Sequence, residues 1–295
     1  MLRPAQRVKR SLRRQVSECP VSIESDDTKT YAILTDTTLC TGCEACVRAC
    51  KETYELGRDR AWRWKTNIDD LSSTRFTTIL TRPGGRHVRQ QCRHCKEPAC
   101  VSACLVGALQ KTELGPVIYD ETRCMGCRYC LVACPYGIPR YKWESPVPFV
   151  RKCILCYDRI KQGQQPACTE ACPYGATIFG TRAEMLAEAR RRIEANPGRY
   201  YPKDAPRIYG EHEVGGTAVL YLSDISLDFL GWQPDLGDEP VPALTWGALS
   251  KVPPIAFGVA AVMSGIYWII GRRVRLQDEA AQAKVNEVSD ETTES

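Results

Sequence analysis

Histidine is scarce in this 295-residue chain, which contains only three. That number leaves little room for histidine-rich zinc or haem sites. Apolar runs are scarce too, because the mean hydropathy is −0.32 and only one long uncharged stretch is present. A protein with several membrane spans is therefore excluded. The chain also lacks a Ser-His-Asp pattern and a phosphate-binding glycine loop, so we expect it not to be an enzyme on its own.

The first thirty residues lack the apolar core of a secretory signal peptide. They carry six basic residues before the first acid, Glu18, including the pair Arg13-Arg14. A twin-arginine export signal needs a hydrophobic region after such a pair, and none follows. We interpret residues 1–30 as a basic, mobile arm that also holds one isolated thiol, Cys19.

Cysteine, in contrast, is abundant: the chain has 17, and 16 of them lie between Cys40 and Cys172. These sixteen fall into four groups of four. The groups are Cys40-x2-Cys43-x2-Cys46-x3-Cys50, Cys92-x2-Cys95-x4-Cys100-x3-Cys104, Cys124-x2-Cys127-x2-Cys130-x3-Cys134 and Cys153-x2-Cys156-x11-Cys168-x3-Cys172.

The first and third groups have the spacing of bacterial ferredoxins. Three close thiolates of such a run bind three irons of one cubane, while the fourth binds a neighbouring cubane. We expect that fourth cysteine to open a short helix, and Gly42 and Gly126 to let each loop wrap around its cluster. The repeat count extends the interpretation to all four groups, which predicts four [4Fe–4S] clusters with the sixteen cysteines as iron ligands.

Two other uses of the thiols compete with this interpretation. Sixteen cysteines could form four all-thiolate zinc sites in a structural or nucleic-acid-binding module, although zinc sites are usually built from separated C-x2-C pairs. Disulfides are the other use. The formal charge of +5 is the support for a nucleic-acid partner. Each thiolate-bound [4Fe–4S] cubane carries about −2, so clusters would offset this excess, and we expect no nucleic-acid partner.

The residues after the cysteine block predict a helix, a strand and a linker. Thr181 and Glu184 form a capping box at the start of a helix over 181–195, which Asn196-Pro197-Gly198 ends. A strand is expected over 217–222, and a linker rich in proline, glycine and acid over 231–245.

One stretch is long and apolar enough to cross a membrane. Residues 252–271 carry no charge between Lys251 and Arg272, and twenty residues of helix span about 30 Å, the thickness of the hydrocarbon layer. Small residues recur at a spacing of four, as in Ala256, Ala260 and Ser264, which favours close approach of a partner helix. The arginines that follow the span favour a cytoplasmic C-terminus.

These motifs carry a family resemblance that covers roughly residues 30–275. They are Cys-Arg-Tyr-Cys-Leu-Val-Ala-Cys-Pro-Tyr (127–136), Lys-Cys-Ile-Leu-Cys-Tyr-Asp-Arg (152–159), Gln-Pro-Ala-Cys (165–168), Cys-Pro-Tyr-Gly-Ala (172–176) and Phe-Gly-Thr-Arg (179–182). The chain resembles the four-cluster ferredoxin-type electron-transfer (beta) subunits of membrane-bound respiratory oxidoreductases, of the quinone-linked [NiFe] hydrogenase and formate dehydrogenase type. Dimethyl sulfoxide and polysulfide reductase subunits are more distant and generally lack the span.

The resemblance implies how the cysteines are shared among the clusters. Cys40, Cys43 and Cys46 would share one with Cys172; Cys153, Cys156 and Cys168 would share one with Cys50; Cys92, Cys95 and Cys100 would share one with Cys134; and Cys124, Cys127 and Cys130 would share one with Cys104. Lys51 and Leu105, each following the last cysteine of its group, depart from the family pattern without removing a ligand.

The resemblance also implies the architecture and the partners. We expect an α+β chain of tandem bacterial-ferredoxin-like folds with short elements, plus one C-terminal transmembrane helix. The divisions are an arm (1–30), the four-cluster domain (31–180), an extension (181–250), an anchor (251–275) and a polar tail (276–295).

The expected role is to relay single electrons between a catalytic oxidoreductase subunit and a multi-span, quinone-binding membrane subunit. A [NiFe] hydrogenase is the favoured catalytic partner; a formate dehydrogenase or a molybdopterin reductase remains the alternative. We expect the cluster domain on the periplasmic side of the inner membrane, carried there by a partner that has the export signal.

Cations beside the ligands have two open roles. Arg93, Arg123, Arg128 and Lys152 would either raise cluster potentials or be ordinary surface charges, and His94 would either tune a cluster or merely close its loop.

Overall fold

The computed structural model describes residues 26–57, 70–82, 85–142, 149–226 and 236–293. Cys19 and nearly all of the predicted basic arm lie outside these residues. Two compact units are present, one up to Pro242 and one from Ala243.

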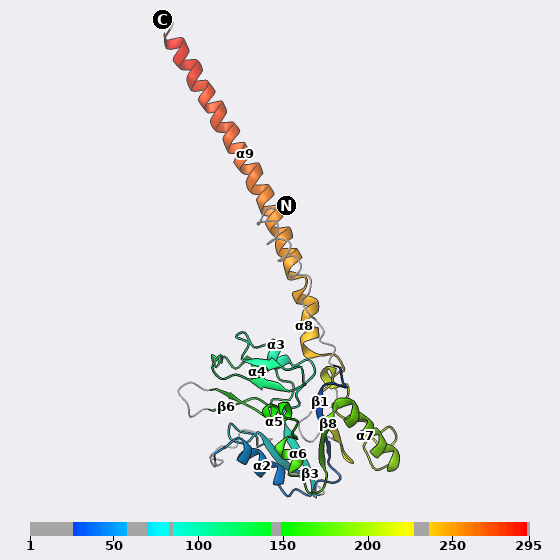
Figure 1. Ribbon diagram of the computed structural model, residues 1–295. Coiled ribbons are helices and arrows are strands. Elements are labelled where there is room, and N and C mark those ends of the chain that lie inside the picture. The colour runs from blue at the N-terminus through cyan, green and yellow to red at the C-terminus, as the bar shows by residue number, and fades with distance from the viewer. Residues whose placement is uncertain (1–25, 58–69, 83–84, 143–148, 227–235, 294–295) are drawn as a thin grey trace, which may run out of the picture. The chain divides into compact units, whose positions relative to one another are not determined.

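The described elements of the first unit are short, as the frequent Gly, Pro and Cys residues predict (Figure 1). They are β1 (Tyr31–Asp36), α2 (Ala45–Thr53), β2 (Thr77–Arg82), β3 (Arg86–Gln91), α3 (Ala99–Ser102), β4 (Leu109–Lys111), β5 (Val117–Tyr119), α4 (Tyr129–Ala133), β6 (Arg140–Tyr141), β7 (Val150–Arg151), α5 (Tyr157–Lys161), α6 (Ala167–Glu170), β8 (Thr177–Thr181), α7 (Arg182–Ala195), the 3-10 turn η2 (Glu213–Gly215) and β9 (Val219–Leu222).

A three-stranded sheet in the order β8-β1-β9 joins the beginning and the end of this unit. Strand β1 runs antiparallel to β8 and parallel to β9. The extension predicted as a separate part after residue 180 therefore shares its sheet with the cysteine block. Helix α7 covers this sheet, because its Met185, Leu186 and Ala189 lie in one buried cluster with Ala32 and Leu34.

The predicted helix and strand of this extension are confirmed. The Thr181 hydroxyl accepts from the Glu184 backbone N–H at 3.3 Å, and the Glu184 carboxylate accepts from the Thr181 N–H at 2.8 Å, which is the expected capping box. Strand β9 begins two residues later than predicted, because Thr217 turns its hydroxyl onto the backbone carbonyl of Val219 at 2.9 Å.

Two pairs of helices repeat the same arrangement in the cysteine block. Helix α2 packs against α6, and α3 packs against α4. Figure 1 shows the first pair at one end of the block and the second pair at the other. The three two-stranded sheets β2-β3, β4-β5 and β6-β7 complete this block.

The expectation that the fourth cysteine of each ferredoxin-type run opens a helix is wrong. In α2 and α4 the third cysteine, Cys46 or Cys130, is the second residue of the helix. The fourth, Cys50 or Cys134, comes four residues later, inside α2 or at the C-cap of α4. A separation of one helical turn places both thiols on the same side of the helix.

The second unit consists of helix α9 (Val252–Thr293) and most of α8 (Val241–Leu249). Helix α8 corrects the predicted linker only over 241–245, where Pro242 stands in the first turn of the helix and is tolerated. Residues 236–240 form no helix or strand, and the part of the linker over 231–235 lies outside the described residues. Helix α9 also continues past Arg272 through most of the predicted polar tail, which is rich in helix-favouring Ala, Gln, Glu and Lys. The segment 241–281 is the one described helix long and apolar enough to cross a membrane.

Candidate metal centre

The fold brings the sixteen predicted cysteines together in four sets of four. Within each set the thiols lie close together, since the charges of the neighbouring thiols raise the pKa of Cys40 and Cys46 in the first set, Cys153 in the second, Cys95 in the third and Cys130 in the fourth. We name the sets quartet A (Cys40, Cys43, Cys46, Cys172), quartet B (Cys50, Cys153, Cys156, Cys168), quartet C (Cys92, Cys95, Cys100, Cys134) and quartet D (Cys104, Cys124, Cys127, Cys130). These are the same sets that the family resemblance implies; their role as iron ligands stays a prediction.

The chemistry of the quartets fits cubanes. All sixteen cysteines are free thiols, so no disulfide occupies them. Among the described residues, no three Cys, His, Asp or Glu side chains converge on the position of a single metal ion. A cubane makes a different demand, because each thiolate binds its own iron at a separate corner.

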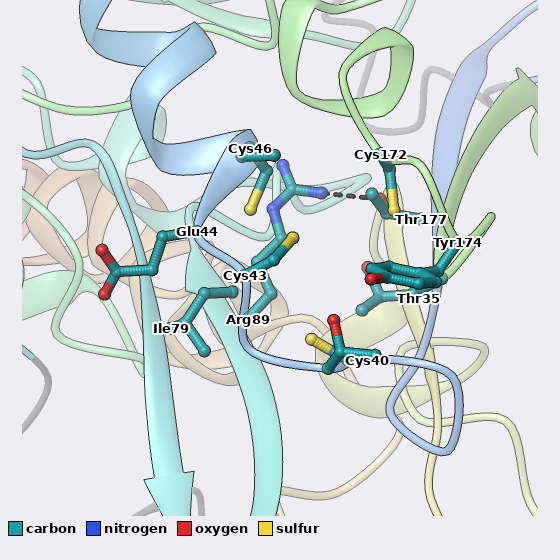
Figure 2. Close-up of a pocket in the computed structure, with 13 residues that line it drawn as sticks. Thr35, Cys40, Cys43, Glu44, Cys46, Ile79, Arg89, Cys172, Tyr174 and Thr177 are labelled. Carbon is teal, nitrogen blue, oxygen red and sulfur yellow. Dashed lines mark hydrogen bonds between the residues drawn. The ribbon is translucent and has the colours of Figure 1, made fainter.

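Quartet A lines a hollow between the loop before α2 and the turn before β8. Figure 2 shows Cys43 and Cys46 on one side of this hollow, Cys172 on the other and Cys40 at the bottom of the view. The Gly42 backbone has φ +74°, and a Cβ there would lie 2.7 Å from the His87 ring. Both the left-handed backbone and the close His87 ring disfavour any side chain at this position, while the role of this glycine in wrapping the loop around a cluster stays a prediction.

The loop before α4 repeats the backbone of the loop before α2. Gly126 has the same φ of 74° as Gly42, and the residues before the two helices, Arg128 and Glu44, are both left-handed, with φ 67° and 55°. Left-handed residues in a loop turn successive backbone N–H groups toward the same concavity. The two ferredoxin-type runs thus fold alike.

Burial controls the protonation of the thiols. It raises the pKa of Cys46 to about 11 and the pKa values of Cys50 and Cys100 to about 12. Thiols with such values are neutral at pH 7 in the absence of a bound cation. Iron would have to displace their protons, as metal binding to cysteine generally does.

Arg89, on β3, is a functional candidate that the sequence analysis missed. Its side chain is buried, and its guanidinium donates to Cys168 Sγ at 2.7 Å. Burial acts to lower the pKa of Arg89, but the charges of Cys168 and Cys46 outweigh it and raise that pKa. The only signal in the sequence is a charged residue within a strand that leads into Cys92.

Two lysines lie beside quartet C, the half-buried Lys111 and the buried Lys152. The Lys111 amine donates to the Cys95 carbonyl of quartet C at 2.8 Å. The Lys152 amine donates to the Cys153 carbonyl of quartet B at 3.0 Å, and its charge also acts to lower the pKa of Cys100 in quartet C. Burial lowers the pKa of Lys111 to about 8, although the charges of Cys95 and Cys92 oppose this shift. Lys152 was predicted beside the ligands, whereas Lys111 was not.

The other predicted cations differ from one another in their surroundings. Arg93 is buried and lies 4.4 Å from the Tyr221 ring centroid, so it packs inside the protein. Arg123 is 57% exposed and pairs with Asp120 at 3.3 Å, which is the ordinary surface role. The Arg128 guanidinium lies 5.6 Å from the centroid of the Tyr141 ring.

His94 closes its loop by a hydrogen bond. Its Nδ1 accepts from the Val117 N–H at 3.0 Å, which fixes the neutral tautomer with the proton on Nε2. Burial, together with the charges of Lys152 and Lys111, lowers the pKa of His94 well below its usual value.

Tyrosine hydroxyls also reach the thiols. Tyr54 bonds to Cys156 of quartet B, and Tyr119 bonds to Cys124 of quartet D. The Tyr141 hydroxyl lies 3.8 Å from Cys130 Sγ, also in quartet D. Hydrogen bonds to sulfur are one of the means by which a protein sets a cluster's potential.

The quartets follow one another in the order A, B, C, D. The charge of Cys168 in B raises the pKa of Cys46 in A, and the charge of Cys92 in C raises the pKa of Cys153 in B. The charge of Cys130 in D raises the pKa of Cys100 in C. Each quartet is therefore close to the next one in the series.

One protein family matches part of the chain, and one known protein matches nearly all of it. The 4Fe-4S dicluster domain family matches residues 86–182, which include twelve of the sixteen cysteines. The formate dehydrogenase, nitrate-inducible, iron-sulfur subunit of Escherichia coli K12 is 34% identical over 92% of this chain and 95% of its own length.

Two further relatives have higher identity. The Hydrogenase-2 operon protein HybA of Escherichia coli O157:H7 is 38% identical over 67% of this chain and 71% of its own length. A protein of Nitratidesulfovibrio vulgaris Hildenborough, whose name states no function, is 39% identical over 86% of this chain and 70% of its own length.

Proposed function

We propose that this chain, which belongs to the iron–sulfur electron-transfer subunits of respiratory oxidoreductases, relays single electrons along four [4Fe–4S] clusters. The observation that carries the proposal is the serial order of the four quartets. Electron tunnelling needs neighbouring redox centres, and quartets A, B and C each have a thiol beside the next quartet in the series.

Each quartet would hold one cubane, which supplies a one-electron redox couple when bound. The chain's own residues would position the thiols around each cubane and tune its potential. Gly42 and Gly126 allow the loops to close, and the paired helices α2 with α6 and α3 with α4 bring in the fourth thiol from a distant segment. Buried cations and tyrosine hydroxyls would set the potentials.

Iron analysis of anaerobically prepared protein tests the number of clusters. We expect about sixteen irons per chain and a brown colour with broad visible absorbance. Cys156→Ser, in quartet B, should lower the iron content or change the cluster type and slow electron transfer through the complex. Cys19→Ser, the matched control outside the quartets, should change neither.

Far fewer than about sixteen irons in the unsubstituted protein would contradict the four-cluster proposal. A colourless protein that binds zinc would contradict the electron-transfer role altogether and favour the zinc module.

We further propose a catalytic subunit at one end of the relay and a quinone-reactive, multi-span membrane subunit at the other. The relative named for the hydrogenase-2 operon is 38% identical, which favours a [NiFe] hydrogenase. The formate dehydrogenase relative favours the alternative, because it matches 92% of the chain. Mass spectrometry of the subunits that co-purify with the chain distinguishes the two, and a molybdopterin-containing partner would overturn the hydrogenase assignment.

Helix α9 would anchor the chain as a single span with a cytoplasmic C-terminus. Three arginines follow the apolar segment, at positions 272, 273 and 275, and positive residues favour the cytoplasmic side. A reporter active only in the cytoplasm should therefore work when fused to the C-terminus, and activity of a periplasmic reporter there would reverse the topology.

A further inference from the structure

A permanent positive charge is buried between quartets A and B. Arg89 is 2% exposed. It donates from Nη2 to Cys168 Sγ of quartet B at 2.7 Å and lines the hollow of quartet A (Figure 2). Its charge acts on Cys46 of A and on Cys153 and Cys168 of B. One guanidinium therefore faces thiols of both quartets.

Neutral partners hold this guanidinium in place. Nε donates to the Thr77 hydroxyl at 3.2 Å, Nη1 to the Thr177 hydroxyl at 2.7 Å, and Nη2 to the Gln91 amide oxygen. These hydrogen bonds fix the orientation of the group but supply no negative charge. Among the residues that the structure describes, no carboxylate forms an ion pair with Arg89.

A buried cation without a counter-charge is costly, because burial removes its hydration. The buried arginine Arg182 meets the usual requirement, since its guanidinium pairs with the Asp27 carboxylate. For Arg89, the groups able to supply negative charge are the thiolates on its two sides. The environment of Arg89 is therefore complete only when both quartets are anionic.

We propose that Arg89 is a positioning residue, the shared counter-cation of quartets A and B, which raises the reduction potentials at both. This inference rests on the proposed function. Reduction adds one negative charge to a site, and a nearby fixed positive charge stabilises that form more than the oxidised form. The effect is confined to the A–B half of the relay, because quartets C and D lie beyond B.

The test is an EPR-monitored redox titration of the whole complex, with iron analysis of each variant. In Arg89→Met, two of the four midpoint potentials should fall, each by at least a tenfold change in the reduction equilibrium, which is 59 mV for one electron. The other two should stay unchanged. Arg89→Lys keeps the charge but not the planar fork, so its shifts should be smaller. Arg182→Met, the control, should leave all four potentials unchanged.

Unchanged potentials in a fully loaded Arg89→Met protein would overturn the proposal, as would equal shifts of all four. If Arg89→Met takes up no iron in two clusters, Arg89→Gln serves for the same titration. Iron loss in both neutral variants but not in Arg89→Lys would support the counter-cation, and loss in all three would reduce Arg89 to a packing residue. An iron-free unsubstituted protein would instead contradict the proposed function.

Discussion

The charged and hydroxyl side chains near the sixteen thiols differ from one quartet to the next. Quartets A and B share the Arg89 cation, quartet C has Lys111 beside it, and Lys152 lies between quartets B and C. Quartet D is partly open to solvent, since Cys127 is exposed, and it has the hydroxyls of Tyr119 and Tyr141 beside its sulfurs. These differences give each quartet its own electrostatic surroundings, so we expect four distinct potentials.

Removing the Tyr54 hydroxyl should lower one of these potentials. Tyr54 bonds to Cys156 and packs its ring 6.0 Å from Phe76, so Tyr54→Phe removes the hydrogen bond and keeps the ring. A lost donor to sulfur disfavours the reduced form, and we expect a shift of up to about 59 mV, a tenfold change in the equilibrium.

The same redox titration measures this shift. Tyr31→Phe is the control, because the Tyr31 ring stacks on Phe179 at 5.1 Å and, among the described residues, its hydroxyl forms no hydrogen bond with a quartet thiol. Equal potentials in Tyr54→Phe and the unsubstituted protein would show that the hydroxyl has no part in tuning.

The short helices of the cysteine-rich unit pack in pairs. Helix α2 contributes thiols to A and B, and its partner α6 contributes Cys168 to B. In the same way, α4 contributes Cys130 to D and, at its C-cap, Cys134 to C, while its partner α3 contributes Cys100 to C. Helices of four or five residues are unstable in isolation, so packing and bound clusters must stabilise them.

Gly42→Ala should disturb quartet A selectively. The substitution places a Cβ 2.7 Å from the His87 ring and strains a backbone at φ +74°. Left-handed strain alone costs about 1–2 kcal/mol. We expect about four irons per chain to be lost, because the loop can no longer close around its cluster.

Gly198→Ala provides the matched control. Gly198 has φ +73°, nearly the same as Gly42, but no atom lies within 4 Å of the position of its Cβ. The control should lose stability without losing iron. Equal iron contents in the two variants would mean that the contact with His87 is unimportant.

The whole molecule combines a cysteine-rich unit with a helical unit. The apolar part of α9 is exposed within the described structure; Val259 and Val262, for example, are 58% and 63% exposed. An exposed run of twenty uncharged, mostly apolar residues is expected in a membrane-spanning helix.

Charges in the middle of this run should release the chain from the membrane. Val259→Arg with Val262→Arg places two charges near the centre of the span, at a cost of about 2.5–3.5 kcal/mol each. The control, Val274→Arg with Leu276→Arg, lies beyond Arg272 and should remain membrane-bound. Cell fractionation measures the outcome, and membrane retention of the first variant without its partner subunits would contradict a spanning role for α9.

Local features of this protein could be read from the sequence. The C-x2-C-x2-C runs, the need for Gly42, the capping box at Thr181 and the apolar span all depend on residues a few positions apart. Local backbone geometry and periodicity therefore predict them. The helix starts near Cys46 and Cys130 could not be predicted, because the cysteine spacing does not say where the loop ends and the helix begins.

The order of the quartets and the role of Arg89 depend on contacts between distant segments. Arg89 meets Cys168 across 79 positions of the chain, and Cys40 meets Cys172 only after the chain has folded back on itself. Such contacts follow from how β3, α2 and α6 pack, and no local pattern encodes that packing. Spacing thus identifies the thiols, whereas their electrostatic neighbours follow from the assembled core.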